Sequence, residues 1–283
     1  MNSRPIVPVD WLLSHLSDSS VKIVDASWHL PTENRDPYAE YLQNHIPGAV
    51  FFDIDSISTP GDLPHMVPSV KIFNESVGKL GLQKNKTIVV YDSKGLFSAA
   101  RVWWTLYVFG FEDVKILDGG LPAWSQSGNQ LESGEVSVEP VTVDASLQSN
   151  AVVNAAQVLE ASESSSAEIL DARSKGRFDG HDPEPRQGLR GGHIPGSKCL
   201  PFTDLLIDGR LKSNDELKLI FAELGISKNT SVYTTCGSGV TAAILTLGLH
   251  CIGMSNTSLY DGSWAEWGGR EDLPVKNNAG SAS

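Results

Sequence analysis

Cysteine and basic residues are scarce in this sequence. Its 283 residues include only three cysteines, at Cys199, Cys236 and Cys251. This odd and sparse count does not suit a disulfide scaffold, so we expect free thiols and a reducing, intracellular location. Lys and Arg together number 22, against 34 Asp and Glu, and the formal net charge is -12. Such an acidic chain argues against nucleic acid or an anionic membrane surface as a partner.

Long apolar runs are absent as well. No run approaches the roughly 20 residues that a helix needs to cross a bilayer. The N-terminal segment MNSRPIVPVDWLLSHL has one Arg, no long apolar stretch and no small-residue cleavage site, which predicts that no secretion signal is present. We therefore expect a cytoplasmic protein that does not bind membranes. The apolar content of 40% is still enough to form well-buried cores.

The sequence repeats itself once. Four short segments recur in the same order at a nearly constant offset of roughly 145 residues, a period within the size range of single domains. The pairs are IVDAS at 23–27 with ILDAR at 169–173, HIPGA at 45–49 with HIPGS at 193–197, TIVVYD at 87–92 with SVYTTC at 231–236, and LDGGLPAW at 117–124 with LYDGSWAEW at 259–267. Four pairs in one register predict two copies of one domain.

In each copy, short β-branched runs alternate with longer segments that are compatible with helices. This pattern predicts an α/β fold in which each copy forms a mostly parallel sheet flanked by helices. Polar residues and turns follow several of the runs, at the sheet edge where open α/β sheets build their sites. We place the first domain at 1–130, a Ser/Gly/Glu/Pro-rich linker at 131–150, the second domain at 151–275 and a frayed tail at 276–283.

The segment TCGSGVTAAIL at 235–245 carries the most informative thiol. Cys236 ends an apolar run and precedes a helix-compatible stretch, so it lies where backbone N–H groups and a helix dipole converge. That setting favours the thiolate over the thiol. Asp92 holds the equivalent position in the first copy. The difference predicts one catalytic domain and one supporting domain.

The residues after Cys236 support this interpretation. Gly237 and Gly239 allow a tight turn that brings N–H groups toward the sulfur, and Ser238 and Thr241 add hydroxyl donors. A buried structural cysteine is the alternative, because free cysteines are often core residues. We prefer that alternative for the other two cysteines, but glycines beside a packed core thiol would have no purpose.

A thiolate in such a loop can attack phosphorus, an acyl carbon or sulfur. A phosphatase loop places an Arg after the Cys and five further residues, where it clamps the phosphoryl oxygens. Ala242 stands at that position here, so phosphate chemistry lacks its clamp. A cysteine hydrolase needs a histidine base, and this alternative stays open. A small cavity that carries a persulfide and is lined by N–H groups fits the loop best.

The doubled domain, the two HIPG segments and the loop CGSGVTA resemble the tandem-domain rhodanese sulfurtransferases, over nearly the whole chain. Within that family, the loop is similar to that of the 3-mercaptopyruvate sulfurtransferases. So are HIPGAVFFDID at 45–55, LPHM at 63–66, FSAARVWW at 97–104 and GRFDGHDPEPRQGLRGGHIPG at 176–196. Thiosulfate-specific members typically carry basic residues directly after the Cys and at the fourth loop position, where this sequence has Gly237 and Val240. A thiosulfate dianion would benefit from positive charge that this loop lacks.

The resemblance implies a two-step sulfur transfer. Cys236 takes the sulfane sulfur of 3-mercaptopyruvate, releases pyruvate and becomes a persulfide. Thioredoxin, a small thiol or cyanide then accepts the sulfur. This chemistry implies no cofactor and no metal.

Substrate recognition requires a cation with fork-like donors, because mercaptopyruvate has a carboxylate and a ketone oxygen. Arg177 and Arg186 stand at positions that the family uses for this contact, with surface ion pairs to Glu184 or Asp182 as the alternative. Arg101 is a further candidate that either faces the cleft between the domains or forms a structural ion pair. The predicted substrate-binding set also includes the loop residues Gly237, Gly239, Val240 and Thr241.

Proton transfer requires a second group near the thiol. Ser238 is the natural hydroxyl relay. The resemblance pairs it with Asp55 of FFDID and places His65 of LPHM close by, whereas a turn-capping aspartate and a hydrogen-bonded loop histidine are the alternatives. The HIPG histidines, His45 and His193, occur in both copies, including the copy without a nucleophile. We therefore expect them to be structural.

Three kinds of function compete. A 3-mercaptopyruvate sulfurtransferase is the leading hypothesis, and a thiosulfate sulfurtransferase is the alternative enzyme, with a cysteine-dependent hydrolase less favoured. A non-enzymatic persulfide carrier or interaction module is the hypothesis from another class. Retention of Cys236, Ser238, Arg177 and Arg186 argues against a carrier, because an inactive scaffold has no need of all four.

Overall fold

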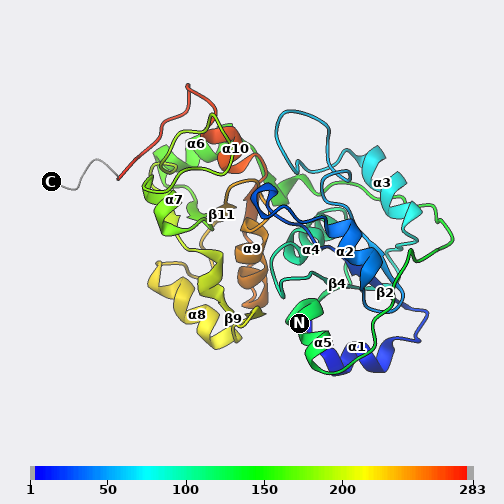
Figure 1. The fold of residues 1–283 in the computed structure, drawn as a ribbon. Helices are drawn as coiled ribbons and strands as arrows, with labels where there is room; N and C mark the ends of the chain where they lie inside the picture. Colours follow the sequence, from blue (N-terminus) through cyan, green and yellow to red (C-terminus); the bar gives the residue numbers. More distant parts are fainter. Residues whose placement is uncertain (1–3, 279–283) are drawn as a thin grey trace.

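The computed structural model describes residues 4–278 and contains two halves built on the same plan (Figure 1). The first sheet consists of β1 (Ile6–Val7), β2 (Val21–Asp25), β3 (Ala49–Phe51), β4 (Thr87–Tyr91) and β5 (Val114–Leu117). The second sheet consists of β6 (Val152–Val153), β7 (Glu168–Asp171), β8 (Lys198–Cys199), β11 (Val232–Thr235) and β12 (Thr257–Tyr260). A separate antiparallel hairpin in the second half consists of β9 (Leu206–Ile207) and β10 (Arg210–Leu211).

The strands of both sheets follow one order. It is β1-β5-β4-β2-β3 in the first half and β6-β12-β11-β7-β8 in the second. Neighbouring strands are parallel throughout both sheets. Equivalent strands therefore occupy equivalent places, which confirms the repeat and the predicted α/β fold. The carboxyl ends of all strands in a sheet meet at one edge, where sites in such sheets form.

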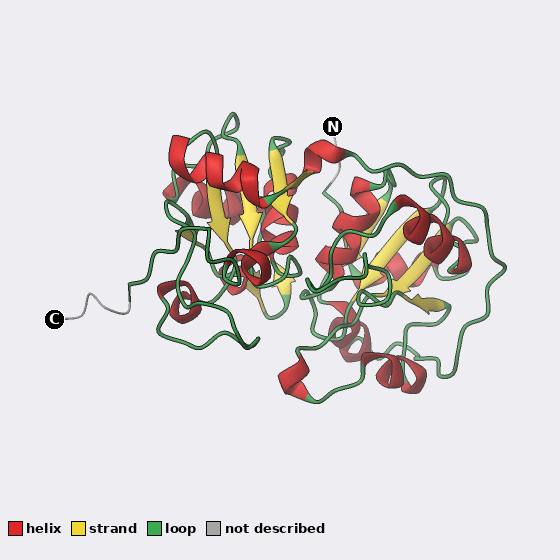
Figure 2. Ribbon diagram, turned by 90° about the horizontal axis from the view of Figure 1, so that it is seen from above, coloured by secondary structure: helices red, strands yellow, loops and turns green. Residues whose placement is uncertain are grey.

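Helices cover both faces of each sheet (Figure 2). The helices of the first half are α1 (Val9–His15), α2 (Pro37–Gln43), α3 (Val70–Lys79), α4 (Ala99–Val108) and α5 (Gly120–Gln126). Those of the second half are α6 (Ala155–Ser164), α7 (Lys175–Asp179), α8 (Asn214–Glu223), α9 (Ala242–Cys251) and α10 (Ser263–Trp267). Three short 3₁₀ helices are η1 (Pro31–Glu33), η2 (Ser149–Ala151) and η3 (Phe202–Leu205).

The central strand β4 illustrates how each sheet is buried on both faces. Ile88 and Val90 point into the core that contains α3 and α4, whereas Val89 and Tyr91 point into the core that contains α1 and α5. All four side chains are inaccessible to solvent. Strands covered on both faces read as continuous apolar runs, which is the pattern of TIVVY.

The two halves meet along α4 and α9, which lie side by side in the middle of the molecule (Figure 1). One apolar core runs through this interface and contains residues of both halves. Every residue of α9 except His250 is buried, as expected of a helix covered on all sides. The amino ends of α4 and α9 approach one another, since Arg101 hydrogen-bonds to the carbonyl oxygen of Gly239. The loops before both helices therefore lie close together.

The HIPG histidines are structural, as predicted. Each Nδ1–H of His45 and His193 donates to a backbone carbonyl oxygen 2.8 Å away, and both rings are buried. Each histidine also pairs through its backbone with the segment that leaves its domain, at Glu132 and at Lys276 respectively. Lys276 belongs to the predicted tail, so the start of that tail is held to the second domain. Residues 279–283 of the predicted tail lie outside the described residues.

The predicted linker crosses the surface of the first domain and packs against it. The N–H of Val141 donates to the carbonyl oxygen of Gly78 in α3, at 2.9 Å. Asn74, in the same helix, exchanges two hydrogen bonds with the backbone of Ala145. The linker is therefore held against α3 at two points, Val141 and Ala145.

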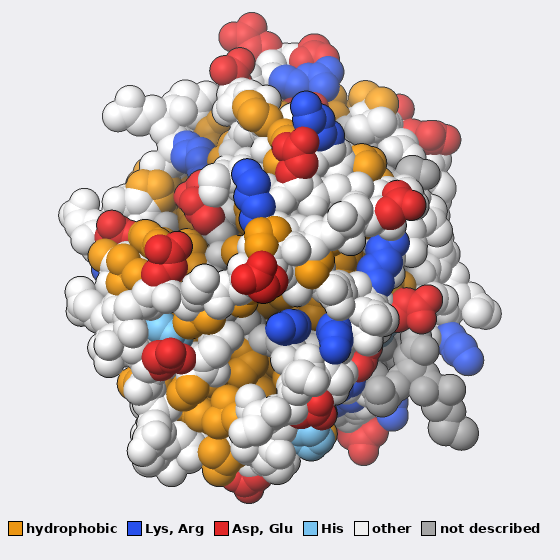
Figure 3. Space-filling view, turned by 90° about the vertical axis from the view of Figure 1, so that its right-hand side faces the viewer, with side chains coloured by type: hydrophobic (Ala, Val, Ile, Leu, Met, Phe, Trp, Pro, Cys, Tyr) orange, Lys and Arg blue, Asp and Glu red, His pale blue; other side chains and the backbone are white. Residues whose placement is uncertain are grey.

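The surface carries both kinds of charge. Figure 3 views the molecule from the side of the first domain, where Lys and Arg side chains alternate with Asp and Glu around small apolar patches. No broad area of one sign is present on this face. Within the part of the chain that the structure describes, no helix has both the length and the apolar character of a bilayer span.

Candidate active site

Cys236 faces a cavity of about 170 Å³ between the two domains. The strand β11 ends one residue earlier, so the thiol lies at the carboxyl edge of the second sheet. The cavity is lined by Trp28, Leu30 and Phe97 from the first domain, and by Ala172, Arg173, Ser174, Arg177, Pro185, Arg186, Phe202, Cys236, Gly237, Ser238, Val240 and Thr241 from the second. Apolar walls around a few charged and hydroxyl groups suit a small polar organic molecule.

The thiol loop is held in place by the start of α10. Cys236 is only 2% exposed, and its N–H donates to the Oγ of Ser263 at 3.3 Å. The carbonyl oxygens of Cys236 and Gly237 accept the N–H groups of Trp264 and Ala265, both at 2.9 Å. These contacts fix the loop backbone without using the N–H groups that follow the cysteine.

The first-domain loop demonstrates what such N–H groups bind. In the first domain, the carboxylate of Asp92 turns back into its own loop and accepts four backbone N–H groups at 2.7–3.0 Å, those of Lys94, Phe97, Ser98 and Ala99. In the second domain, no N–H of residues 237–243 donates a hydrogen bond to any described residue. The cradle that holds an anion in one domain is therefore open beside Cys236 in the other, where a thiolate or persulfide anion can use it.

Two glycines of the loop leave room for arginines. Gly239 has φ +79°, and a Cβ there would lie 2.7 Å from Nη1 of Arg101. A Cβ on Gly237 would lie 3.0 Å from Nη2 of Arg177, so the absence of a side chain lets this guanidinium approach the thiol loop. The structure does not place Gly239 on the cavity wall. Its positive φ gives it a role in the turn, whereas Gly237, Val240 and Thr241 line the cavity.

Ser238, His65 and Asp55 form one hydrogen-bonded chain across the domain interface. The Oγ of Ser238 lies 3.0 Å from Nδ1 of His65, and Nε2 of His65 lies 2.8 Å from Oδ1 of Asp55. The Nε1–H of Trp28 donates to the other carboxylate oxygen of Asp55 at 3.1 Å. Ser238 and His65 are buried, whereas the Asp55 side chain is 64% exposed. The structure thus brings together the three predicted proton-transfer residues.

The order of these contacts assigns the direction of proton transfer. The hydrogen bond from His65 lowers the pKa of Asp55, so this carboxylate stays ionised at neutral pH. An ionised carboxylate favours the tautomer of neutral His65 that carries its proton on Nε2. Nδ1 is then free to accept the hydroxyl proton of Ser238. The division of roles is that of Ser-His-Asp groups that activate a hydroxyl, with the two ring nitrogens exchanged.

Arg177 and Arg186 both line the cavity, as predicted, but they differ in their partners. Nη2 of Arg177 lies 2.5 Å from Oε2 of Glu184, the ion pair considered as the alternative. Arg186 makes no ion pair or hydrogen bond with another described residue. Burial lowers the pKa of Arg186, while the nearby Cys236 acts in the opposite direction. Arg186 is therefore the cation most available to a substrate carboxylate.

Arg173 is a site residue that the sequence prediction missed. Its guanidinium is inaccessible to solvent and lies 2.7 Å from both Asp171 and Glu184. Glu184 thereby bridges Arg173 and Arg177 and holds the second guanidinium beside the thiol loop. The repeat could have pointed to Arg173, because this arginine of ILDAR stands where the first copy, IVDAS, has Ser27.

Arg101 is a correction to the predicted substrate-binding set. It does not line the cavity, and its side chain is 2% exposed. Its guanidinium pairs with Asp261 at 2.7 Å and stacks over the ring of Trp104, 4.6 Å from its centroid. The structural ion pair, which was the alternative, is the arrangement found, and the guanidinium also donates to the carbonyl oxygens of His65 and Gly239.

The other two thiols are far less suited to chemistry. Both are free, and burial raises the pKa of Cys199 and of Cys251 to about 12. Cys251 is buried, as predicted for a structural cysteine, whereas Cys199 is only half-buried. Neither lines the cavity that contains Cys236.

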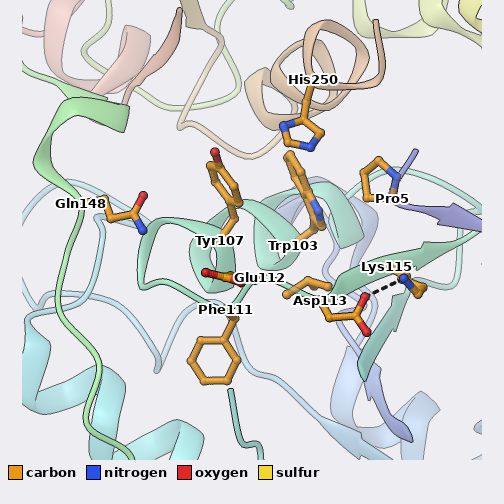
Figure 4. A pocket seen from close by; sticks show the side chains of 10 residues that line it. Pro5, Trp103, Tyr107, Phe111, Glu112, Asp113, Lys115, Gln148 and His250 are labelled. Carbon is orange, nitrogen blue, oxygen red and sulfur yellow. Dashed lines mark hydrogen bonds and ion pairs between the residues drawn. The ribbon is translucent and has the colours of Figure 1, made fainter. Parts of the chain in front are cut away.

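A larger cavity of about 430 Å³ lies at the opposite ends of α4 and α9 (Figure 4). There His250 sits over the rings of Trp103 and Tyr107, with centroids 5.3 and 5.5 Å away. No cysteine or serine lines this cavity. Size alone therefore does not identify the site, whereas the thiol and the hydrogen-bonded Ser238–His65–Asp55 chain favour the cavity at Cys236.

Known proteins with similar sequences and structures agree with this geometry. Residues 8–127 and 154–270 each match the rhodanese-like domain. The chain belongs to the rhodanese-like family. Within this family, a 3-mercaptopyruvate sulfurtransferase of Escherichia coli (strain K12) is 45% identical over 278 residues, covering 98% of this chain and 99% of that protein. A mitochondrial thiosulfate/3-mercaptopyruvate sulfurtransferase of Arabidopsis thaliana is 44% identical, covering 97% of this chain and 79% of that protein.

A solved rhodanese-like structure has the same arrangement of two domains. The crystal structure of SseA, a 3-mercaptopyruvate sulfotransferase of Escherichia coli, matches with a TM-score of 0.86 at 42% identity. The match covers 93% of this chain and 99% of that one. The family resemblance drawn from CGSGVTA and the HIPG segments is thus confirmed.

Proposed function

We propose that this protein is a 3-mercaptopyruvate sulfurtransferase whose second domain carries the reaction. The observation that carries the proposal is the juxtaposition of Cys236, the unpaired Arg186 and Ser238 in one small cavity, with His65 and Asp55 continuing the hydrogen-bonded chain from Ser238 behind it. A nucleophile, a cation for a carboxylate and a route for a proton are what this substrate requires. The relatives from Escherichia coli and Arabidopsis thaliana are both named as 3-mercaptopyruvate sulfurtransferases, which supports the same reaction.

In the proposed reaction, the Cys236 thiolate attacks the sulfur of 3-mercaptopyruvate. The new S–S bond forms as the C–S bond breaks, and the bonding electron pair stays on the three-carbon fragment as the enolate of pyruvate. The proton released from the substrate thiol passes to the methylene carbon, which completes pyruvate. The remaining sulfur stays on the enzyme as a persulfide anion, so no external oxidant or reductant is needed.

Each surrounding group has one role in this step. Ser238 carries the proton between the substrate sulfur and carbon, and His65 accepts and returns it through Nδ1. The open N–H groups after Cys236 stabilise the thiolate before the reaction and the persulfide anion after it. Arg186 binds the carboxylate, and Arg177, held by Glu184, lies where it can contact the ketone oxygen.

The second half of the reaction transfers the sulfur to an acceptor. We propose thioredoxin, a small thiol or cyanide as acceptors, and a cytoplasmic location. No metal or cofactor takes part in the proposed steps. Pyruvate release measured with and without reduced thioredoxin tests the acceptor, and an unchanged steady-state rate would exclude thioredoxin.

Substitution of Arg186 by methionine should raise the KM for 3-mercaptopyruvate by about 30-fold. Hydrogen bonds to charged groups contribute roughly 1.5–3 kcal/mol, and Arg177 alone retains only part of that binding. Initial rates of pyruvate release over a range of substrate concentrations measure the effect. Arg35→Met is a matched control, because Arg35 pairs with Glu40 on the first domain and does not line the cavity. An unchanged KM in Arg186→Met would contradict the assignment.

Mercaptopyruvate should be preferred to thiosulfate by at least about 10-fold in kcat/KM. The loop itself carries no basic side chain. A side chain at position 237 would point toward space that the Arg177 guanidinium already occupies. The relative from Arabidopsis thaliana is named for both donors, so thiosulfate is the alternative substrate. Steady-state kinetics with each donor and cyanide as acceptor decide between them. A higher kcat/KM for thiosulfate would overturn the proposed donor.

A further inference from the structure

Arg101 and Asp261 form a buried ion pair across the domain interface. Arg101 lies in α4 of the first domain, and Asp261 directly follows β12 of the second. Nη2 of Arg101 is 2.7 Å from Oδ1 of Asp261, and the two side chains are only 2% and 5% exposed. A pair removed from water in this way is not screened as surface ion pairs are.

The ion pair holds the loop that carries His65 at two points. Nη2 of Arg101 also donates to the carbonyl oxygen of His65 at 2.5 Å. Two residues later, the N–H of Val67 donates to Oδ2 of Asp261 at 2.6 Å. At the first of these contacts His65 adopts φ +60°, a conformation that residues with a Cβ rarely take. Such a conformation persists only where the surroundings hold it, and the ion pair supplies that restraint.

The same guanidinium reaches the thiol loop. Nη1 of Arg101 lies 3.4 Å from the carbonyl oxygen of Gly239, the residue after Ser238. The ion pair therefore contacts both loops whose side chains meet in the hydrogen bond between His65 and Ser238. Because these two residues come from different domains, the distance between their side chains depends on how the two domains pack against each other. Small errors in such a separation reduce catalysis strongly.

The repeat indicates that the fold alone does not require this arginine. SAAR at 98–101 aligns with TAAI at 241–244, and α4 and α9 begin at the same point of the two segments. The equivalent of Arg101 is thus Ile244, which is inaccessible to solvent and packs in the core. Burying a guanidinium is unfavourable unless it is paired. Its presence in only one of two equivalent helices points to a role beyond packing.

We infer that Arg101 and Asp261 are positioning residues that set the contact between His65 Nδ1 and Ser238 Oγ. Neither residue lines the cavity, so neither is expected to contact the substrate. Their effect should fall on kcat and act through the serine relay. The kinetic part of this inference rests on the proposed function.

A double-mutant cycle with Ser238 tests this inference. Arg101→Lys keeps the charge but cannot reach three acceptors, so kcat for pyruvate release should fall about 10-fold with KM within about 3-fold of wild type. In a Ser238→Ala background, the same substitution should change kcat less than about 2-fold, because the contact it positions is already gone. Equal losses in both backgrounds would show a general structural role and overturn the inference. Asp261→Asn, which keeps the shape of the side chain, is the second variant in the same cycle.

A second ion pair between the domains provides matched controls. Asp118 is the repeat counterpart of Asp261, and it pairs with Arg210 of the second domain at 3.4 Å on the exposed side of the interface. Arg210→Lys and Asp118→Asn should leave kcat unchanged. Comparable losses in these controls would also overturn the inference.

A readout that needs no substrate separates this inference from the proposed function. In ¹⁵N-labelled protein, the chemical shift of His65 Nδ1 should move in Arg101→Lys and in Asp261→Asn, but not in the two control variants. An unchanged shift in both Arg101→Lys and Asp261→Asn would contradict the positioning role. A wild-type protein that releases no pyruvate from 3-mercaptopyruvate would contradict the proposed function instead, and the chemical shift would still decide the positioning role.

Discussion

Replacing Cys236 by serine should abolish sulfur transfer, with pyruvate release from 3-mercaptopyruvate falling roughly 10⁴-fold or more. A hydroxyl is close in size to a thiol, so the buried loop can keep its packing. Serine is a much weaker acid than cysteine, however, and an oxygen at this position cannot store sulfane sulfur as a persulfide. Initial rates measure the loss. Intact-protein mass spectrometry after incubation with 3-mercaptopyruvate should find one added sulfur in the wild type and none in the variant.

Cys199→Ser is the matched control for this experiment. It is the same substitution in the same domain, at a thiol outside the cavity whose pKa burial raises to about 12. This control should keep full activity and gain sulfur as the wild type does. Turnover retained in Cys236→Ser would remove the nucleophile assignment and favour a hydrolase. A wild-type protein that never gains sulfur would favour an interaction module.

The fold and the thiol loop could be predicted because both leave local signals. Buried parallel strands read as short continuous apolar runs, and the repeat doubled the evidence for each run. The contrast between Asp92 and Cys236 also led to the prediction that only one half is catalytic. The structure adds the reason. The Asp92 carboxylate accepts the backbone N–H groups of its own loop, whereas the equivalent N–H groups of the thiol loop are left for the sulfur or a bound ligand.

The walls of the cavity could not be predicted, because they depend on how the domains pack. Trp28 and Phe97 come from the first domain and Phe202 from the second, and nothing in their local sequence distinguishes them from core aromatics. Tertiary contacts also decided the role of Arg101, which local sequence left open. Its burial beside Asp261 is a property of the interface and not of FSAARVWW.

His65 is a second residue whose contacts could not be predicted from local sequence. The resemblance placed it near the site, but residues alone gave a loop histidine equal standing. Its contact with Ser238 joins positions 173 residues apart in sequence. A pairing over such a distance has no periodicity to reveal it, and only the packed domains can establish it.

Replacing His65 by asparagine should lower kcat for pyruvate release by about 10²–10³-fold, within the usual range for a general base or acid. Asparagine tolerates the left-handed backbone that His65 adopts at φ +60°, so the loop should keep its course. Its side chain cannot carry a proton between Ser238 and Asp55. KM should change little, because His65 does not line the cavity, whereas the Arg186 variant should show the opposite division between KM and kcat.

His250→Asn provides the matched control for this variant. His250 packs edge-on against the stacked rings of Trp103 and Tyr107 in the larger cavity (Figure 4), and no hydrogen bond joins it to Ser238, His65 or Asp55. Its substitution should leave kcat unchanged. Asp55→Asn should lower kcat less than His65→Asn does, because Asp55 acts only by orienting the ring and holding its proton on Nε2. If His65→Asn kept wild-type turnover while Ser238→Ala lost it, the serine would act without the histidine, and the observed hydrogen bond would be structural.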